Sequence, residues 1–347
     1  PPNLNRGLSK INQGGWMKII KVGGGCLKDP NTIARIVALM ADRGRGHVFV
    51  VSALNGITDL LIESMPAALM DEAAIPGLIE RLKHHHRQAA RRVVLGKTAL
   101  KAYDRDLDMG LSRLERLYYG LNFTREITPR LKDVISSFGE RLAAQLLAAA
   151  LCSQGLAAAY WLPHKIGLIT DGKFGDATAD LTKTGRNFRH HLTSLTGADK
   201  ILLIPGFFGI STSGDITTFG RGGSDYSAAV AAAALQAEVL EIWKNTQGFM
   251  SADPQLVAEA ELIPVLSYEE AAELAYFGAR ILHPRTVEPA RKKRIRITIK
   301  NTLAPEVPGS EIRSRSPRSR QVIKSVAHDC DIGILKVDAS GVGARPG

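Results

Sequence analysis

Two glycine-rich connections that follow apolar segments are the clearest places in the sequence where chemistry could occur. The first reads Lys21-Val-Gly-Gly-Gly-Cys26 and the second reads Gly220-Arg-Gly-Gly-Ser-Asp225. Glycine lets backbone N–H groups approach an anion closely, and the helix after each connection would present its positive N-terminus to that anion. Neither connection fits the G-x-x-x-x-G-K-[ST] pattern of a P-loop or the G-x-G-x-x-G pattern of a dinucleotide site. Each connection alone is a weak signal, because tight turns use the same glycines.

Three charged side chains at these connections have the chemistry that phosphoryl transfer uses. Lys21 is the last polar residue of an apolar segment, where it could neutralise the charge of a phosphate. Arg221 could bind a carboxylate through two parallel hydrogen bonds. Asp225 could hold Lys21 or the ammonium group of a substrate. Phosphoryl transfer needs positioning and charge neutralisation more than covalent help from the protein, so this set is compatible with it.

Glu140 is a fourth candidate because it interrupts the apolar pattern of residues 136–151. A carboxylate in such a helix can bind a substrate, or it can form a structural ion pair with Arg130 or Arg141. The residue types alone favour neither interpretation over the other. Cys26, beside the first glycine turn, could be a weakly reactive thiol, and a small packed residue is the favoured interpretation.

Apolar strands that alternate with helices must position these residues. This alternation favours an α/β fold with a parallel sheet. The Gly/Ser/Thr-rich stretch 205–223 is expected to be a long functional loop. The expected strands are 17–22, 47–52, 201–204, 238–243 and 295–300, and the expected helices are 30–41, 57–69, 128–151, 224–235, 267–277 and 284–292, with 76–120 helical and charged.

Length and composition indicate an ordinary globular chain. The 347 residues suggest two domains. A content of 45% hydrophobic and 23% charged residues rules out wholly disordered, collagen-like and coiled-coil proteins. No apolar run reaches about 18 residues, so we expect no membrane span, and residues 1–16 show no secretory signal. Three widely spaced cysteines form no disulfide framework, and a reducing cytoplasm is the simplest compartment.

Two polar runs are interpreted as solvated surfaces rather than binding sites. Residues 291–324 hold eleven lysines and arginines against Glu306 and Glu311, a net charge of +9 within a chain of net charge +11. A nucleic-acid patch is one interpretation, but no nucleic-acid motif accompanies the charge, and a solvated linker is favoured. His84, His85 and His86 point in different directions on a helix, so they predict a solvated helix face and no metal site.

Six ordered sequence blocks between Met17 and Ile312 match the pattern of one enzyme family. The family opens with a strand and K-F-G-G-T-S, where this chain has residues 21–26. Several long blocks in the same order are far more specific than one glycine motif, and the chain therefore resembles the aspartate kinases of the amino-acid kinase superfamily. The other matches are 50–61 for V-V-S-A-x-x-G-x-T-[DN]-L-L, 137–143 for S-x-G-E-x-x-[AS], 217–226 for T-T-L-G-R-G-G-S-D-Y, 270–284 for E-A-x-E-L-A-Y-F-G-A-K-V-L-H-P and 299–302 for I-K-N-T.

The resemblance implies a three-layer αβα sandwich with a mainly parallel central sheet. It implies transfer of the ATP γ-phosphate to the β-carboxylate of L-aspartate, the first step to lysine, threonine and methionine, with Mg²⁺ and a homodimer. The expected domains are an N-terminal extension at 1–16, a catalytic domain at 17–303 and a basic linker at 304–324. Residues 325–347, with a strand at 332–337, resemble the cut-off start of an ACT-type regulatory domain, which in the family binds lysine or threonine.

The resemblance also assigns roles on the acceptor side. Lys21 would contact the transferring phosphoryl group, and Asp225 would orient Lys21 and the reacting groups. Arg221 would bind the α-carboxylate of aspartate, and Glu140 would bind its α-ammonium. The same pocket would be lined by Ser52, Thr58 and Ser224.

The nucleotide side departs from the family pattern. Where the family has W-T-D-V-D-G-V-Y-T-A-D-P, this chain has Lys244 and Asn245 in place of the Thr-Asp pair, and Met250 in place of an aromatic residue. Arg280 replaces a lysine. These departures leave two alternatives open. The chain could be a kinase for an aspartate analogue in a specialised pathway, or a non-catalytic homologue that binds aspartate or a nucleotide. The expected nucleotide-binding residues are Gly23, Gly24, Gly25, Gly222, Gly223, Lys244, Asn245, Met250 and Arg280.

Overall fold

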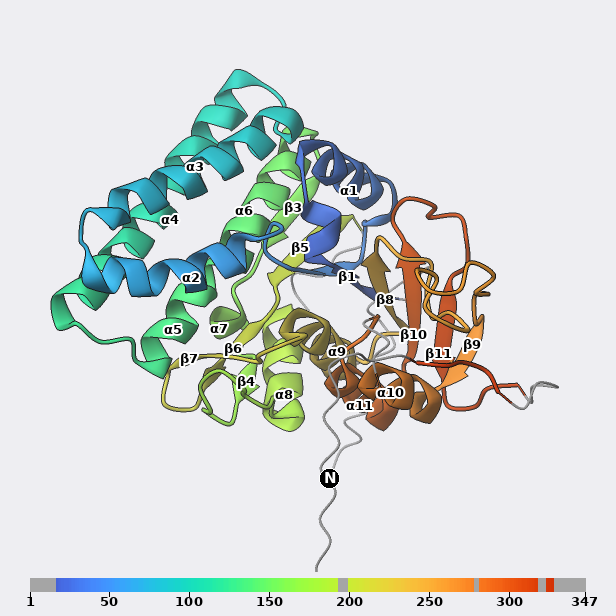
Figure 1. Cartoon of the computed structure of the whole chain (residues 1–347). Helices are drawn as coiled ribbons and strands as arrows, with labels where there is room; N and C mark the ends of the chain where they lie inside the picture. Colours follow the sequence, from blue (N-terminus) through green and yellow to red (C-terminus); the bar gives the residue numbers. More distant parts are fainter. Residues whose placement is uncertain (1–16, 193–198, 278–280, 318–322, 328–347) are drawn as a thin grey trace, which may run out of the picture.

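An eight-stranded sheet runs through the molecule, and helices cover both of its faces (Figure 1). The computed structural model describes residues 17–192, 199–277, 281–317 and 323–327. Every neighbouring pair of strands in this sheet is parallel except β10 and β11. The strand order is β3 (Ala157–Tyr160), β5 (Lys200–Pro205), β2 (Val48–Val51), β1 (Lys18–Val22), β8 (Val239–Lys244), β10 (Arg296–Asn301), β11 (Ser310–Arg313) and β9 (Val265–Ser267).

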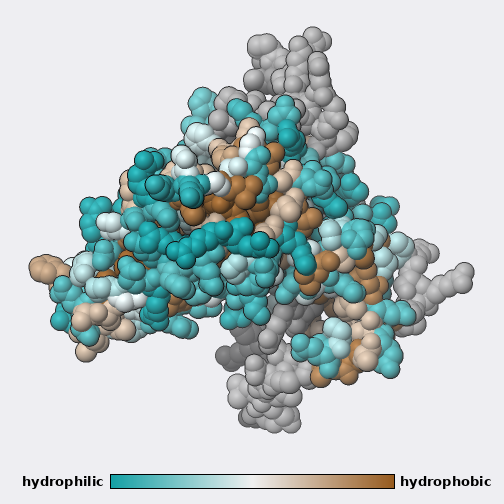
Figure 2. Space-filling view, turned by 90° about the horizontal axis from the view of Figure 1, so that it is seen from above, coloured by the Kyte–Doolittle hydropathy of each residue, from teal (hydrophilic) through white to brown (hydrophobic). Residues whose placement is uncertain are grey.

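Two hydrophobic cores, one on each face of the sheet, make the molecule three-layered. The first core is built with α1 (Pro30–Arg43), α2 (Ile57–Met70), α3 (Ala74–Val93), α4 (Lys97–Thr124), α5 (Pro129–Ser136) and α6 (Phe138–Ser153). The second is built with the short α7 (Pro163–Ile166), α8 (Leu181–Leu192), α9 (Gly223–Leu235), α10 (Tyr268–Tyr276) and α11 (Pro284–Lys293). The expected αβα sandwich with a mainly parallel sheet is confirmed. Seen from above, the surface is mostly hydrophilic, with a hydrophobic band across its middle (Figure 2).

The alternation of side chains along β1 decides where its lysine lies. Successive residues of a strand point to opposite faces of the sheet. Ile20 and Val22 pack into the first core, whereas Ile19 packs into the second, beneath α9. Lys21 therefore shares the face of Ile19 and meets the beginning of α9.

The stretch expected to be one long loop contains a β-hairpin instead. Strands β6 (Phe208–Ser211) and β7 (Ile216–Thr218) pair antiparallel, and β4 (Ile169–Thr170) pairs with β6 in a separate three-stranded sheet. The hairpin forms because Phe208 and Thr217 are fully buried and Gly214 turns the chain at φ +91°. The many Gly, Ser and Thr residues hid this short alternation in the sequence.

The helix expected over 128–151 is interrupted at Ser137, between α5 and α6. The hydroxyl of Ser136 donates to the carbonyl of Lys132, and that of Ser137 donates to the carbonyl of Val134. Serine side chains that compete for helix carbonyls in this way weaken or bend a helix. By length and composition Pro129–Ser153 could cross a membrane, but 78% of the apolar window is buried inside the fold, as in a core helix.

The run of three histidines is not the fully solvated helix face that was expected. His86 is fully buried, not solvated, because it shares a helix face with the buried Leu82 and Ala90; His84 and His85 are exposed. Its Nδ1 donates to the Leu82 carbonyl at 2.9 Å, and burial lowers its pKa to about 4.

The expected linker 304–324 is not all linker, because its residues Ser310–Arg313 form β11 within the main sheet. In the sheet β11 lies between β10 and β9, and the Pro- and Arg-rich composition did not reveal this pairing. Several basic residues nearby are paired at the surface, Arg291 with Glu288 at 2.9 Å and Arg296 with Glu238 at 3.2 Å. The extension 1–16, Arg280 and the strand expected at 332–337 lie outside the described residues.

Candidate functional site

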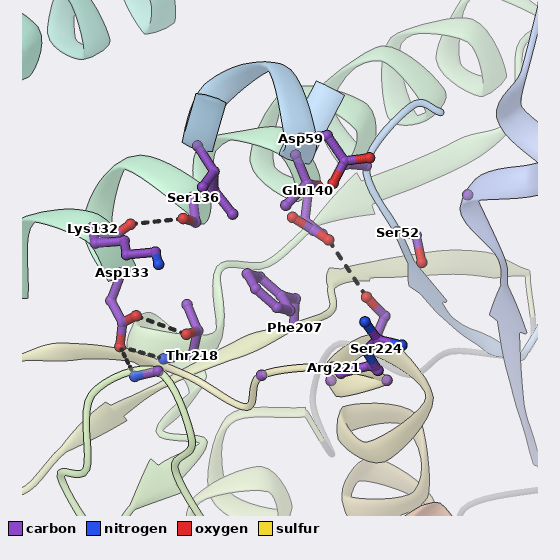
Figure 3. A pocket seen from close by; sticks show the side chains of 18 of the residues that line it. Ser52, Asp59, Lys132, Asp133, Ser136, Glu140, Phe207, Thr218, Arg221 and Ser224 are labelled. Carbon is purple, nitrogen blue, oxygen red and sulfur yellow. Dashed lines mark hydrogen bonds between the residues drawn. The ribbon is translucent and has the colours of Figure 1, made fainter. Parts of the chain in front are cut away.

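A cleft of about 920 Å³ opens where β1 and β2 end and α2, α6 and α9 begin (Figure 3). The carboxyl ends of parallel strands are where open α/β sheets bind ligands. Of the residues expected at the site, ten line this cleft: Lys21, Gly24, Ser52, Thr58, Glu140, Arg221, Gly222, Gly223, Ser224 and Asp225.

Asp225 lies between two lysine ammonium groups at the inner end of the cleft. Lys21 Nζ is 2.5 Å from Asp225 Oδ1, and Lys244 Nζ is 3.3 Å from Asp225 Oδ2. Burial by itself would raise the pKa of Asp225, but the charges of Lys21 and Lys244 hold it below its usual value. Burial lowers the pKa of Lys244, and Asp225 opposes that change. Asp225 is thus a buried, ionised carboxylate shared by two cations.

Glu140 is the second buried carboxylate of the cleft, and it is not consumed by an ion pair. Its Oε1 accepts a hydrogen bond from Ser224 Oγ at 3.5 Å, and its Oε2 has no hydrogen-bond partner among the described residues (Figure 3). Burial raises the pKa of Glu140 to about 8, although the backbone of Ala53, the Ser224 hydroxyl and the charge of Lys21 lower it. A buried, partly unsatisfied carboxyl group is costly unless a ligand completes it.

The arginines that could have paired with Glu140 are used elsewhere. Arg130 binds Asp215 with 2.8 Å between Nη2 and Oδ1. The guanidinium of Arg141 stacks over the rings of Phe138 and Phe208. The structural interpretation of Glu140 as an ion-pair partner is therefore wrong.

Arg221 stands on a turn whose backbone conformation favours glycine on both sides of it. Gly220 and Gly222 on either side of it have φ of +69° and +71°, and a Cβ on Gly222 would lie 2.4 Å from Cβ of His283. This left-handed backbone favours glycine. Arg221 is exposed at the cleft and forms no hydrogen bond or ion pair with the part of the chain that the structure describes.

Close approach of α6 to the start of α2 depends on Gly139. A Cβ at this position would lie 2.8 Å from Cβ of Ala53 and 3.3 Å from Oγ1 of Thr58. Glycine at this position therefore lets Glu140, the next residue, reach the cleft beside Thr58.

We expect Gly139→Ala to destabilise the fold by about 1–3 kcal/mol, because Ala53 and Gly139 belong to packed elements that must move apart. Gly120→Ala is the matched control, since Gly120 is exposed within α4 and a Cβ there meets no atom within 4 Å. The control should stabilise the helix by about 0.5–1 kcal/mol. Urea unfolding of both variants measures the difference, and equal effects would contradict this packing argument.

Four of the expected nucleotide-binding residues lie close to one another. Gly23 sits between the two lysines, since a Cβ on it would be 3.4 Å from Lys21 Nζ and 4.0 Å from Lys244 Cγ. A Cβ on Gly25 would be 3.7 Å from the side-chain amide of Asn245. Lys244, Asn245, Gly23 and Gly25 thus gather beside the cleft.

Met250 does not join this group. It pairs with Leu262, and its carbonyl accepts a hydrogen bond from Ser325 Oγ at 2.8 Å. It does not line the cleft either. Cys26 is buried, where burial raises the pKa of its thiol and Thr302 donates to its sulfur. This environment agrees with the packed-residue interpretation.

Sequence reasoning missed the residues that hold the outer wall of the cleft. Asp133 is buried in α5, where its carboxylate accepts hydrogen bonds from the backbone of Gly175 and from both the backbone and hydroxyl of Thr218 (Figure 3). Phe207 lines the cleft with φ +76°, an uncommon conformation for a residue other than glycine that often marks functional sites. The position of Asp133 after a Thr-Pro helix start gave no signal, because its partners are distant in sequence.

No group of three His, Cys, Asp or Glu side chains that could hold a metal ion occurs within the described residues. Mg²⁺ is usually held by one or two carboxylates together with substrate phosphates and waters, so it needs no such cluster. The buried, ionised Asp225 fits that limited role.

Comparisons with known proteins agree with this arrangement. The model of the amino acid kinase family matches residues 16–301. Aspartokinase 1, chloroplastic, of Arabidopsis thaliana is 27% identical over 95% of this chain and 58% of that protein. A bifunctional aspartokinase/homoserine dehydrogenase of Haemophilus influenzae is 28% identical over 94% of this chain and 40% of that protein.

Solved structures give the same result. E. coli aspartokinase III in complex with aspartate and ADP superposes with a TM-score of 0.78 and 25% identity, over 87% of this chain and 65% of that one. An aspartate kinase of Clostridium acetobutylicum has a TM-score of 0.72 and 25% identity, over 89% of this chain and 66% of that one. The expected resemblance is thereby confirmed, and the chain spans less than two thirds of the length of each of these relatives.

Proposed function

The chain belongs to the amino acid kinase family, and from this premise we propose that it transfers the γ-phosphate of ATP to the β-carboxylate of L-aspartate. The product would be 4-phospho-L-aspartate. The observation that carries the proposal is that one cleft is lined by two residues that lack partners among the described residues: Glu140, whose Oε2 accepts no hydrogen bond, and Arg221, which forms no ion pair. This pair is complementary to the ammonium and carboxylate of an amino acid. The similarity to a solved aspartokinase that holds aspartate and ADP supports the choice of substrates.

On the acceptor side, Arg221 binds the α-carboxylate with its two-pronged guanidinium, and Glu140 accepts hydrogen bonds from the α-ammonium. Ser52, Thr58 and Ser224 line the same space and offer hydroxyl groups. Ser224 already bonds to Glu140, so it holds that carboxyl group in place. The β-carboxylate of the substrate is then left to face Lys21.

In the transfer, an oxygen of the β-carboxylate forms a bond to the γ-phosphorus. The bond from that phosphorus to the oxygen bridging to the β-phosphate breaks, and ADP leaves with the electron pair. The nucleophile is already an anion, so no base must remove a proton. Lys21 neutralises the charge that moves across the phosphoryl oxygens, and Asp225 fixes Lys21 at 2.5 Å.

On the donor side, the glycines at 23–25 and 222–223, with Asn245, would receive the phosphates. Asp225 would hold Mg²⁺ together with those phosphates, and the ion would supply charge neutralisation there. Roles for Met250 and Arg280 stay predictions, as do the homodimer, the cytoplasmic location and the regulatory segment.

The proposed function is tested by calorimetric titration of the chain with Mg-ATP and then with L-aspartate. We expect both ligands to bind. Binding of aspartate without any purine triphosphate would leave a non-catalytic aspartate-binding homologue, and binding of neither would contradict the proposal.

The pKa of Glu140 predicts how aspartate binding depends on pH. With a pKa of about 8, the free carboxyl group is mostly protonated at neutral pH. A charged carboxylate binds the substrate ammonium better, so KM for aspartate should fall as pH rises from about 6.5 to 8.5. Glu140→Gln should raise KM and remove this dependence. A KM that varies equally in both proteins would contradict the assignment.

Glu140 also makes the stability of the ligand-free protein depend on pH, and here a rise in pH is unfavourable. Its pKa is raised on folding, so the ligand-free folded state binds more protons than the unfolded state between about pH 4.5 and 8. The contribution of Glu140 to stability is therefore lost as pH rises through that range. Ligand-free Glu140→Gln should gain thermal stability relative to the parent at pH 8, and a calorimetric scan at pH 5 and pH 8 measures this gain.

A further inference from the structure

We propose that Lys244 is a second phosphate-binding cation, which exchanges its contact with Asp225 for the polyphosphate tail of the donor nucleotide. The proposal rests on the proposed function of the cleft and specifies which part of the donor Lys244 recognises.

Two ammonium groups share one carboxylate in a place that is largely closed to water. The exposed fractions of the side chains are 7% for Lys21, 7% for Asp225 and 19% for Lys244. Within the described ranges, no second carboxylate forms an ion pair with either lysine. Buried charge in excess of its partners is unfavourable, so this cluster of net charge +1 is completed by an anion.

The strands place both lysines on the same face of the sheet. Lys21 follows Ile19 on β1, and Lys244 follows Leu240 and Ile242 on β8, all of which face the second core. The two strands are neighbours, with Lys21 paired to Ile242 in register. Lys244 therefore lies one pleat beyond Lys21, towards the open end of the strands.

The two lysines flank the backbone turn that an anion would approach. Gly23 lies between them and leaves no side chain in the way. Its own N–H donates to the Trp243 carbonyl at 3.1 Å, which ties the turn to the end of β8. Asn245 brings its side-chain amide to Gly25 on the same side. These groups make a cationic, amide-rich surface suited to phosphate oxygens.

The geometry separates the donor side from the acceptor side at Asp225. Lys21 lines the cleft with Glu140 and Arg221 and contacts one oxygen of Asp225. Lys244 contacts the other oxygen and does not line that cleft. Its Nζ also donates to the Ile281 carbonyl, so it has a neutral partner to keep when it leaves Asp225. An ammonium on a flexible stem can make this exchange, because it binds phosphate as a point charge.

The experiment uses the full chain with Lys244→Met and Lys244→Arg. Calorimetry measures binding of tripolyphosphate, Mg-ATP and AMP, and a steady-state assay measures KM for aspartate. For Lys244→Met we expect affinities for tripolyphosphate and Mg-ATP to fall about tenfold or more, as for loss of a charged hydrogen bond. AMP binding and KM for aspartate should change less than about twofold. Lys244→Arg should keep part of the affinity, since it keeps the charge.

The matched control is Lys200→Met, because Lys200 is exposed at the start of β5 and does not line the cleft. It should leave tripolyphosphate binding unchanged. A purely structural Lys244 would instead weaken AMP, aspartate and the melting temperature together, and that result would overturn the proposal. Tripolyphosphate that binds Lys244→Met as well as the parent, or that fails to bind the parent, would overturn it too. The tripolyphosphate measurement needs no turnover, so its outcome is independent of whether aspartate is the acceptor.

Discussion

Replacing Lys21 by methionine should lower kcat by about 10²–10³-fold while the protein still binds aspartate. We expect a large loss because Lys21, which lines the cleft at 2.5 Å from Asp225, is the cation that we propose to face the reacting groups. In the proposed mechanism its charge is needed in the transition state, and we expect the fold to stay intact because methionine fills a similar volume. Asp225 would still be paired with Lys244.

The control for this variant is Lys18→Met on the same strand, which removes an ion pair with Glu241 away from the cleft. Its kcat should stay within about twofold of the parent value. A Lys21→Met enzyme that keeps more than a tenth of the parent kcat would contradict the role assigned to Lys21, provided that circular dichroism shows both variants folded.

Replacing Arg221 by alanine should raise KM for aspartate by about 10–100-fold, because a bidentate charged contact with the substrate α-carboxylate is lost. The exposed position of Arg221 means that little stability is lost with it. Calorimetry should show that aspartate binding is abolished or greatly weakened and that Mg-ATP binding is kept.

Arg221→Lys should recover only part of the affinity, since an ammonium cannot grip both oxygens of a carboxylate. Arg105→Ala, which removes an exposed arginine of α4 outside the cleft, should change nothing. If Arg221→Ala weakens Mg-ATP as much as aspartate, then Arg221 serves the donor and the orientation of the two substrates must be reversed.

The sequence predicts much of this site because its elements follow local patterns. The apolar run before Lys21 indicates a strand, and the glycines around Arg221 indicate a tight turn at the start of a helix. Parallel strands bring such turns to one edge of the sheet, which is where the structure has them.

What the sequence could not predict depends on contacts between distant residues. Whether Glu140 pairs with an arginine is decided by Asp215 and Phe208, which occupy Arg130 and Arg141. The hairpin at 208–218 and the strand at 310–313 were missed for a different reason. They form through pairing with nearby segments and through burial, which composition does not record.

The donor side is where the chain departs from its family pattern. Lys244 was recognisable as a substitution in a motif, but its position against the second oxygen of Asp225 was not. Lys21 pairs in register with Ile242, and Lys244 lies two residues further along β8. Because side chains alternate along a strand, this spacing alone could have placed Lys244 on the same face of the sheet as Lys21.

The most direct test of the central claim is to incubate the chain with Mg-ATP and L-aspartate in the presence of hydroxylamine, which traps an acyl phosphate as its hydroxamate. We expect β-aspartyl hydroxamate and ADP in equal amounts, with both lost in the Lys21→Met variant. ADP without hydroxamate, or hydroxamate formed equally fast by Lys21→Met, would contradict it.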